Sequence, residues 1–193
     1  MYIRREPTPY KGEKWGFDNG VYSHFLKGEP FDDDKYLFRL DRAYRVGTPY
    51  LSVAPDIVGG GEKSLELSMK WMDKLPAWPW YLAVQDGMTE AMVRPVLNRF
   101  DGLFLGGSNG FKATAYHWRV FAHAHGKKFH YGRAGTARKI QHAIEVGADS
   151  ADSAFPLWTI ERLAETIKYV KNLEQQGCLW DTSVSAKNIM GGE

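Results

Sequence analysis

Three carboxylates and one carboxamide each follow a different apolar segment of the chain, and side chains of these types can act together in catalysis. They are Asp18, Asp56, Asp152 and Gln85. Gathered in one site, one carboxylate could act as a nucleophile, one as a general acid or base, and one as a hydrogen-bonding anchor. A carboxylate nucleophile is used to trap an oxocarbenium-like sugar carbon, as in retaining glycosyl transfer. These residues therefore indicate transfer at a sugar carbon as one candidate reaction.

Other residues near these positions suit the recognition of a flat ring. Gly106 and Gly107 follow another apolar segment, while Tyr22 and Tyr131 are close to two of the segment ends. The Gln85 amide and the backbone N–H groups of a Gly-Gly turn can bind the edge of a planar heterocycle, and two tyrosines can sandwich its faces. That set suits a nucleobase, although one fold can support many other reactions.

Each of these residues also has an ordinary structural explanation. Asp18 could form the turn of an Asp-Asn-Gly sequence, and Asp56 could cap the segment that follows it. The amide, the glycine pair and the tyrosines could be a loop residue, a tight turn and core aromatics. Asp149 lies three residues before Asp152, so along a strand the two point to opposite faces, and we interpret Asp149 as structural.

The segments that must position these residues alternate between strand and helix patterns. Strands are predicted at 14–17, 49–54, 79–84, 101–105, 128–131 and 148–152, and helices at 33–45, 63–75, 90–99, 113–124, 137–146 and 159–175. Such alternation is typical of parallel βαβ units. Polar residues after nearly every strand favour a barrel over an open doubly wound sheet. A full barrel usually needs ~250 residues, so we predict an α/β protein with a compact TIM-like (β/α) barrel that has fewer or irregular strands.

Length and composition fit one globular unit. The 193 residues are 44% hydrophobic and 25% charged, enough for one sizeable core. We expect a single domain over 1–193, with a core at about 15–176 and a polar tail at 177–193. Cys178 is the one cysteine, so an internal disulfide is excluded and a reducing compartment is expected. Because no window resembles a signal peptide or a membrane span, we expect a cytoplasmic protein, in the host cytoplasm if it is phage-encoded.

The distribution of charge points to a polyanion. Residues 111–144 contain no Asp or Glu. Their basic residues are Lys112, Arg119, Lys127, Lys128, Arg133, Arg138 and Lys139. A one-sided basic face is the footprint of a nucleic-acid partner, and we predict that these residues bind it. The alternative is an ordinary solvated basic surface.

Histidines are also concentrated in this stretch. They are His117, His123, His125, His130 and His142. Their spacing offers no compact ligand set, because two histidines at i and i+2 of a helix do not share a face. We therefore predict no metal site, and nothing in the sequence indicates another cofactor.

Taken in order, the motifs resemble those of the tRNA-guanine transglycosylase superfamily. The motifs are DNG at Asp18, VAPDIVG at Asp56, VQDG at Gln85, LFLGGS at Gly106 and Gly107, HYGR at Tyr131, and GADSADS at Asp152. They span residues 17–158. The resemblance is greater to the phage and bacterial paralogues that insert 7-deazaguanines into DNA. Each motif is short, and their order and spacing carry the resemblance.

This resemblance implies a barrel and a role for each residue. Asp152 matches the nucleophile that attacks C1′ of the target guanosine, and Asp18 matches the general acid/base. Asp56, Gln85 and the Gly106-Gly107 region match groups that read the edge of the base, while Tyr22 and Tyr131 match positions that stack on it. The implied partners are DNA and a free 7-deazaguanine such as preQ0, without a cofactor and without a membrane.

The sequence also departs from the tRNA enzymes. Those enzymes carry a C-terminal Cys/His zinc site that a chain with only Cys178 cannot form, and they are longer. Both departures favour DNA over tRNA. A tRNA-directed or nucleoside-directed transglycosylase of the same superfamily stays an alternative, as does a nucleic-acid-binding or structural phage protein without activity. Asn19-Gly20-Val21 also replaces the Ser-Gly-Gly that often follows the acid/base, so the resemblance does not specify the details of the base pocket.

Overall fold

In the computed structural model of the protein, residues 2–4, 14–75 and 77–175 are described. They fall into two compact units that divide between Ser153 and Ala154. Each unit is described by itself. The predicted polar tail at 177–193, with Cys178, lies outside the described residues.

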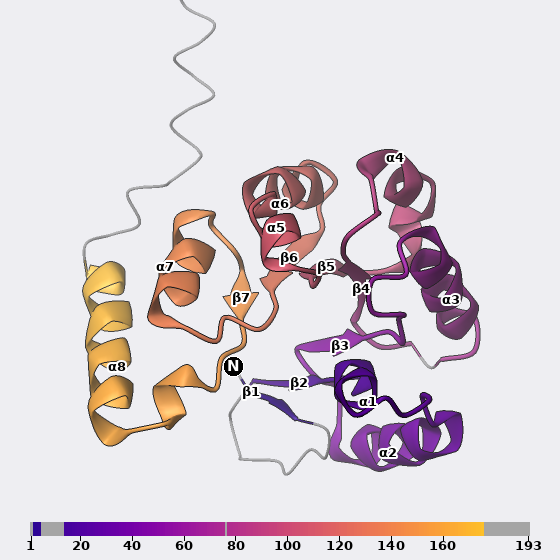
Figure 1. Ribbon diagram of the computed structural model, residues 1–193, viewed down its shortest axis with the longest axis horizontal. Helices are drawn as coiled ribbons and strands as arrows, with labels where there is room; N and C mark the ends of the chain where they lie inside the picture. Colours follow the sequence, from indigo (N-terminus) through magenta and orange to yellow (C-terminus); the bar gives the residue numbers. More distant parts are fainter. Residues whose placement is uncertain (1, 5–13, 76, 176–193) are drawn as a thin grey trace, which may run out of the picture. The chain divides into compact units, whose positions relative to one another are not determined.

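The first unit is built on a curled parallel sheet in which each strand pairs with the next along the chain (Figure 1). The strands are β1 (Tyr2–Arg4), β2 (Trp15–Phe17), β3 (Leu51–Val53), β4 (Trp80–Val84), β5 (Gly102–Leu105), β6 (Lys128–Tyr131) and β7 (Ser150–Ala151). Parallel pairing in sequence order places the carboxyl ends of all these strands at one edge of the sheet. The predicted βαβ organisation is therefore confirmed.

Helices connect the strands, and those that follow β3 to β6 form an outer layer around the curled sheet (Figure 1). The helices of this unit are α1 (Val21–Lys27), α2 (Asp33–Val46), α3 (Glu62–Met72), α4 (Glu90–Val93), η1 (Arg94–Arg99, a 3₁₀ helix), α5 (Asn109–Lys112), α6 (Ala115–Ala124) and α7 (Ala137–Glu145). A right-handed crossover from one parallel strand to the next packs each such helix back onto the sheet.

The α/β class is confirmed, but the sheet is not a closed barrel. In the described part of the chain, β1 pairs only with β2 and β7 only with β6, so the curled sheet stays open as a half-barrel. Strand number and strand length explain this. The last strand has two residues, and an eight-stranded barrel with its helices takes ~250 residues.

Two of the expected helical segments differ from the prediction, and a local feature of the sequence explains each difference. The helix predicted at 113–124 corresponds to α6, and the short helix α5, which was not predicted, precedes it because Ser108 caps an earlier start by accepting from the Phe111 amide at 3.2 Å. The segment predicted at 90–99 changes to a 3₁₀ helix at Arg94, where Pro95 removes a backbone donor. Helix α7 begins where predicted, with Thr136 accepting from the Lys139 amide at 3.2 Å.

Both faces of the sheet are covered, as is usual for parallel strands. Along β4, Leu82 and Val84 face the helices and join the larger core cluster, whereas Tyr81 and Ala83 face the inside of the curl. The Leu82 side chain is fully buried, and truncation of such a residue to Ala typically costs about 2–5 kcal/mol. Because the apolar cluster inside the curl is small, it leaves space for a cavity at the carboxyl edge of the sheet.

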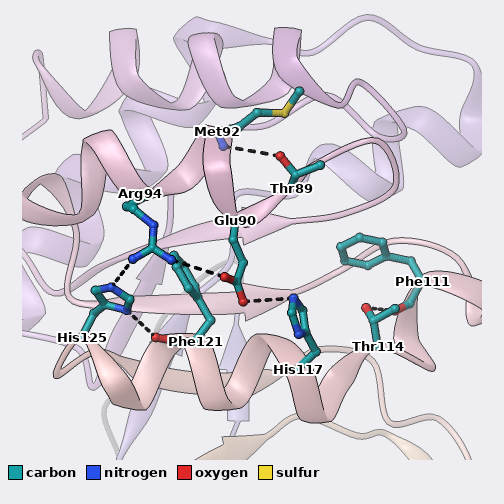
Figure 2. Close-up of polar contacts among 9 residues, drawn as sticks. All are labelled: Thr89, Glu90, Met92, Arg94, Phe111, Thr114, His117, Phe121 and His125. Carbon is teal, nitrogen blue, oxygen red and sulfur yellow. Dashed lines mark hydrogen bonds and ion pairs between the residues drawn. The ribbon is translucent and has the colours of Figure 1, made fainter.

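A polar cluster links α4 to α6 in the outer layer, as Figure 2 shows. The Glu90 carboxylate lies 2.9 Å from Nε2 of His117 and 3.4 Å from Nη2 of Arg94. Nδ1 of His125 is 2.8 Å from the Phe121 carbonyl, so this nitrogen carries the proton and Nε2 accepts from Arg94 at 2.9 Å. Because these side chains are partly exposed, each pair contributes little to stability, about 1 kcal/mol or less.

The second unit contains the 3₁₀ helix η2 (Phe155–Leu157) and the helix α8 (Ile160–Gln175). The predicted helix at 159–175 is confirmed, and its first turn is capped by Thr159, which accepts from the Arg162 amide at 3.2 Å. The Arg162 guanidinium lies over the rings of Phe155 and Trp158, at 4.8 and 5.4 Å. Among the helices of the described residues, none combines the length and apolar character needed to cross a membrane.

Candidate active site

A cavity of about 210 Å³ lies at the carboxyl edge of the sheet. Its walls come from the segments that follow β2 to β7, together with α1. The predicted residues that line it are Asp18, Tyr22, Asp56, Gln85, Gly106, Gly107 and Asp152. Asn19, Ser23, Phe104 and Arg133 also contribute. Side chains far apart in the sequence are thus brought to one place, as the strand order predicts. The volume is below the about 300–1,000 Å³ of drug-sized pockets, and suits one small planar ligand.

Asp152, directly after β7, is held on one side only. Its Oδ1 accepts from the backbone N–H of Arg133 at 2.8 Å and lies 3.1 Å from Nε2 of His130. Ser150 sits 2.8 Å from the other ring nitrogen, Nδ1. We assign the proton to Nε2, so that the imidazole donates to Asp152 and accepts from the Ser150 hydroxyl. No described residue hydrogen-bonds to Oδ2 of Asp152, which leaves that oxygen for a ligand.

The environment keeps Asp152 ionised. Burial raises the pKa of Asp152, but the hydrogen bond from His130, the Arg133 amide and the nearby Lys112 ammonium outweigh it and place the pKa below its usual range. Complete burial lowers the pKa of His130, so the imidazole is neutral near pH 7 and acts as a donor. His130 also stacks on Phe104, with ring centroids 4.9 Å apart, which fixes the orientation of the imidazole.

Asp56 belongs to a second hydrogen-bonded group on the other side of the cavity. Its Oδ1 accepts from Nδ2 of Asn19 at 2.9 Å, and its Oδ2 accepts from Nε2 of Gln85 at 3.2 Å. The same Gln85 nitrogen donates to the Ser64 hydroxyl at 2.8 Å, and Oε1 of Gln85 accepts from the Gly59 amide at 2.7 Å. Gln85 is therefore a buried bridge that orients Asp56, and not only a loop amide.

Burial raises the pKa of Asp56 to about 6, and the negative charge of Asp18 adds to this effect. The hydrogen bonds from Asn19 and Gln85 oppose the rise, as does the charge of Arg133. A carboxyl group that titrates near neutral pH can hold or release a proton during a reaction. Asp56 and Asp152 are thus two carboxylates of one cavity with pKa values displaced in opposite directions.

Asp18 is placed by Arg39 from α2. The Nη2 atom of Arg39 donates to the backbone carbonyls of Asn19 at 2.8 Å and Asp18 at 3.4 Å, so the guanidinium supports the turn after β2. A Cβ on Gly20 would come within 3.0 Å of that guanidinium, and Gly20 has a φ of 81°. Only glycine suits this position, and the turn directs the segment from β2 into α1.

The Gly106-Gly107 turn is fixed by the loop after β4. The Asp86 carboxylate accepts from the backbone N–H of Ser108 at 2.7 Å and from its hydroxyl at 2.6 Å. These bonds lower the pKa of Asp86. Gly107 has a φ of 72°, and a Cβ there would lie 2.6 Å from Oδ2 of Asp86. The turn therefore requires glycine at 107, and it presents backbone polar groups to the cavity.

Tyr22 and Arg133 meet across the cavity. The Arg133 guanidinium carbon lies 3.9 Å from the centroid of the Tyr22 ring, and its Nη2 donates to the Gly107 carbonyl at 3.0 Å. The backbone of Arg133 has a φ of 55°, a conformation that non-glycine residues rarely adopt. One face of Tyr22 is thus covered by Arg133 in this structure, while its ring is 40% exposed.

Tyr131 does not line the cavity. Its side chain is buried in the core beneath the helices, where it packs against His142 and Lys112. Successive residues of a strand face opposite sides, so Phe129 and Tyr131 of β6 face outward and His130 faces inward. The prediction that Tyr131 stacks on a ring in the cavity is therefore wrong, and it is His130 of this strand that contacts Asp152.

Comparison with protein-family models and with curated proteins finds no match to this chain. In the part of the chain that the structure describes, no group of three or more His, Cys, Asp or Glu side chains is arranged to hold a metal ion.

The seven basic residues predicted to bind nucleic acid lie at two different edges of the sheet. Three belong to the amino edge: Lys127 donates to the carbonyl of Phe100, Lys128 begins β6, and Arg119 donates to the carbonyl of Gly147, which precedes β7. The other four follow β5 or β6 at the carboxyl edge. They are Lys112, Arg133, Arg138 and Lys139. Because the length of β6 separates the two groups, the basic residues of 111–144 do not form one continuous face of the molecule.

Three residues of the site were given other interpretations from the sequence, and Ser23 and Phe104 of the cavity lining were not singled out. Asn19 was seen only as part of a turn, His130 only as a possible metal ligand, and Arg133 only as a contact for nucleic acid. A signal for His130 was present. In the short strand β6, alternation places His130 on the inner face, opposite to Phe129 and Tyr131, and nearest to the carboxyl edge.

Proposed function

We propose that this protein is a DNA guanine transglycosylase that exchanges guanine for a 7-deazaguanine base through a covalent sugar intermediate on Asp152. The observation that carries the proposal is the convergence of Asp18, Asp56 and Asp152 with Gln85 in one small cavity. Three carboxylates with different surroundings supply the separate roles that such an exchange needs. The order of motifs described above supports the same reaction.

In the first half of the reaction, Oδ2 of Asp152 attacks C1′ of the target nucleoside. The C1′–O bond forms while the bond from C1′ to N9 of guanine breaks, and the bonding electron pair goes to the base, which takes a proton from Asp18; Asp18 enters this step as the neutral carboxylic acid and leaves it as the carboxylate. His130 and the Arg133 amide hold Oδ1 of Asp152, so the carboxylate stays ionised and oriented during the attack. The product is an ester between Asp152 and the sugar, plus free guanine.

In the second half, a 7-deazaguanine replaces guanine in the cavity. Its N9 loses a proton to Asp18 and attacks C1′, the ester bond breaks, and the Asp152 carboxylate is released. Two displacements at the same carbon retain the configuration. The target base reaches the cavity only after it leaves the helical stack, at a cost of a few kcal/mol that is smallest in single-stranded DNA.

Recognition of the base is assigned to the Asp56 side of the cavity. The Asp56 carboxylate, oriented by Asn19 and Gln85, accepts N–H groups from the edge of the ring. Gly106 and Gly107 line the same cavity. The Gly107 N–H is assigned to the edge of the base, since the Gly106 N–H donates to the Val84 carbonyl and the Gly107 carbonyl accepts from Arg133. For the base to stack on Tyr22, the Arg133 guanidinium must leave that ring, so we expect Arg133 to move when the base binds.

The proposal is tested by mass spectrometry of nucleosides from cells that express the protein and are supplied with preQ0. We expect a 7-deaza-2′-deoxyguanosine peak in hydrolysed DNA and none in hydrolysed tRNA. A modified nucleoside in tRNA alone would assign the tRNA-directed reaction instead. Absence of the peak from both, with oligonucleotide binding retained, would assign a binding protein without transferase activity.

The nucleophile is tested with Asp152→Asn. This variant keeps the shape of the side chain, so we expect it to fold, to lose exchange and to form no covalent adduct with single-stranded DNA on a denaturing gel. Asp73→Asn is the matched control. It changes an exposed carboxylate that pairs with Arg99 and does not line the cavity, so exchange and the covalent adduct should both be retained. Turnover of Asp152→Asn at the wild-type rate would remove Asp152 as the nucleophile.

A further inference from the structure

A second depression, of about 700 Å³, lies beside the active-site cavity at the carboxyl edge of the sheet. It is lined by α5, by the first and last turns of α7, and by the outer side of β6. The residues that matter here are Lys112, Tyr131, Arg138, Lys139 and His142. We call it the α5–α7 groove.

The α5–α7 groove carries more positive than negative charge, and the Asp152 carboxylate, which acts on Lys112, is not part of its lining. In the described part of the chain, neither Lys112, Arg138 nor Lys139 forms an ion pair. The one carboxylate of the lining, Glu145, accepts a hydrogen bond from Gln141 at 2.8 Å. A groove of this kind is suited to an anion, which would screen the repulsion between the cations.

Lys112 is the unusual member of this group because it is 4% exposed. Its ammonium donates to the carbonyl of Gly132 and lies 4.8 Å from the Tyr131 ring centroid. Burial lowers the pKa of Lys112 to about 7, and the positive charges of Arg133 and Lys139 contribute. An ammonium has three donors, so Lys112 can serve Gly132 and an anion together, and a bound anion would keep it protonated.

The groove is connected to the reactive carboxylate by one turn of the chain. Lys112 holds the carbonyl of Gly132, and the next residue, Arg133, donates its backbone N–H to Asp152. An anion bound in the groove therefore lies on the far side of the turn from the cavity. For a nucleotide with its base in the cavity, the neighbouring part of the strand must pass this edge.

We propose that the α5–α7 groove binds a phosphodiester of the polynucleotide strand that flanks the target nucleotide, through Lys112, Arg138 and Lys139. This inference rests on the proposed function for the choice of a polynucleotide. It goes beyond that function by dividing the basic residues: those at the carboxyl edge hold the strand, and those at the amino edge do not. Lys112 links the phosphate to the turn that orients Asp152.

The test is binding of a fluorescent single-stranded oligodeoxynucleotide, measured by anisotropy between about 0.05 and 0.5 M NaCl. The double variant Arg138→Gln/Lys139→Gln is expected to lower the slope of log K against log salt by about 0.7, the value for one phosphate on a single strand. At 0.1 M salt this corresponds to about a fivefold loss of affinity. Thermal unfolding followed by circular dichroism should match the wild type, because Arg138 is exposed and Lys139 is half-exposed on α7.

Lys128→Gln is the control at the amino edge, where it removes one exposed positive charge, and the single variant Arg138→Gln is measured beside it so that equal changes in charge are compared. We expect Lys128→Gln to retain both affinity and slope. Equal losses in Lys128→Gln and Arg138→Gln would mean unspecific attraction and would overturn the groove, as would wild-type binding by the double variant or no binding by the wild type. If the groove variants behave as expected while nucleoside analysis finds no exchange, the proposed function fails and the phosphate site stands.

Discussion

Protonation of Asp56 is expected to stabilise the folded protein as the pH falls below neutral. The folded-state pKa of about 6 lies above the ordinary value of 3.8. Between these two values the folded protein binds more protons than the unfolded chain, so the free energy of unfolding decreases as the pH rises. The cost of the buried charge is absent below about pH 3.8 and complete above about pH 6.

The size of the effect follows from the difference between 3.8 and about 6. A tenfold change in a proton-binding constant corresponds to about 1.4 kcal/mol, so ionised Asp56 costs about 3 kcal/mol. Asp56→Asn has no charge to bury. Urea unfolding of both proteins from pH 4 to pH 7.5 should show the wild type losing up to about 3 kcal/mol relative to the variant as the pH rises. The substitution also changes the free energy of unfolding by an amount that does not depend on pH. This amount does not affect the test, because only the pH dependence of the two proteins is compared.

Asp152→Asn provides the contrast in the same assay. The pKa of Asp152 is lowered, so its carboxylate contributes stability that is present above the ordinary pKa and is lost as the pH falls below it. Relative to its own variant, the wild type should therefore not weaken between pH 4 and pH 7.5. If the difference between wild type and Asp56→Asn were independent of pH, or increased with pH, the burial argument for Asp56 would be refuted.

Three further changes test other parts of the fold and site. His130→Leu removes the donor to Asp152 and should raise the pKa of that carboxyl group and slow the exchange. In a pH–rate profile the loss of rate should become smaller at higher pH, and a profile equal to that of the wild type would exclude this role of His130. Gly132→Ala places a Cβ 2.4 Å from Phe104 and should cost about 1–3 kcal/mol in urea unfolding; a neutral result would show that the ring yields freely. Glu90→Gln removes the partly exposed carboxylate that contacts His117 on α6 and Arg94 in the next turn and should cost about 1 kcal/mol or less in urea unfolding; a larger cost would show that the cluster in Figure 2 is a main support of the outer layer.

The order of strands and the position of the site could be predicted because both depend on local patterns. Short apolar runs followed by a polar residue mark the carboxyl ends of parallel strands, and parallel strands in sequence order bring those ends together. Asp18, Asp56 and Asp152 are far apart in the chain, yet this rule alone places them at one edge. The helix predicted at 137–146 begins at Ala137 in the structure, where Thr136 caps it.

Closure of the sheet could not be predicted, because it depends on the number and register of strands and not on any one segment. Strand β1 carries no clear period, and β7 has two residues. Helix α1 was missed because seven residues give too short a pattern, although Gly20 and Gly28, both with positive φ, bracket it. Hydrogen bonds such as that between His130 and Asp152 depend on distant segments meeting, which spacing does not encode.

In the proposed exchange, the surroundings of Asp152 and Asp56 favour Asp152 over Asp56 as the nucleophile. A nucleophilic carboxylate must be ionised when the sugar arrives, and Asp152 is kept so by donors from His130 and the Arg133 amide. Asp56 is buried near a second negative charge, that of Asp18, and its oxygens are taken by amide groups. Attack by Asp56 would break those bonds, whereas attack by Asp152 uses an oxygen that no described residue occupies. Under the proposed function, the fold thus separates the carboxylate that would react with the sugar from the carboxylate that would read the base.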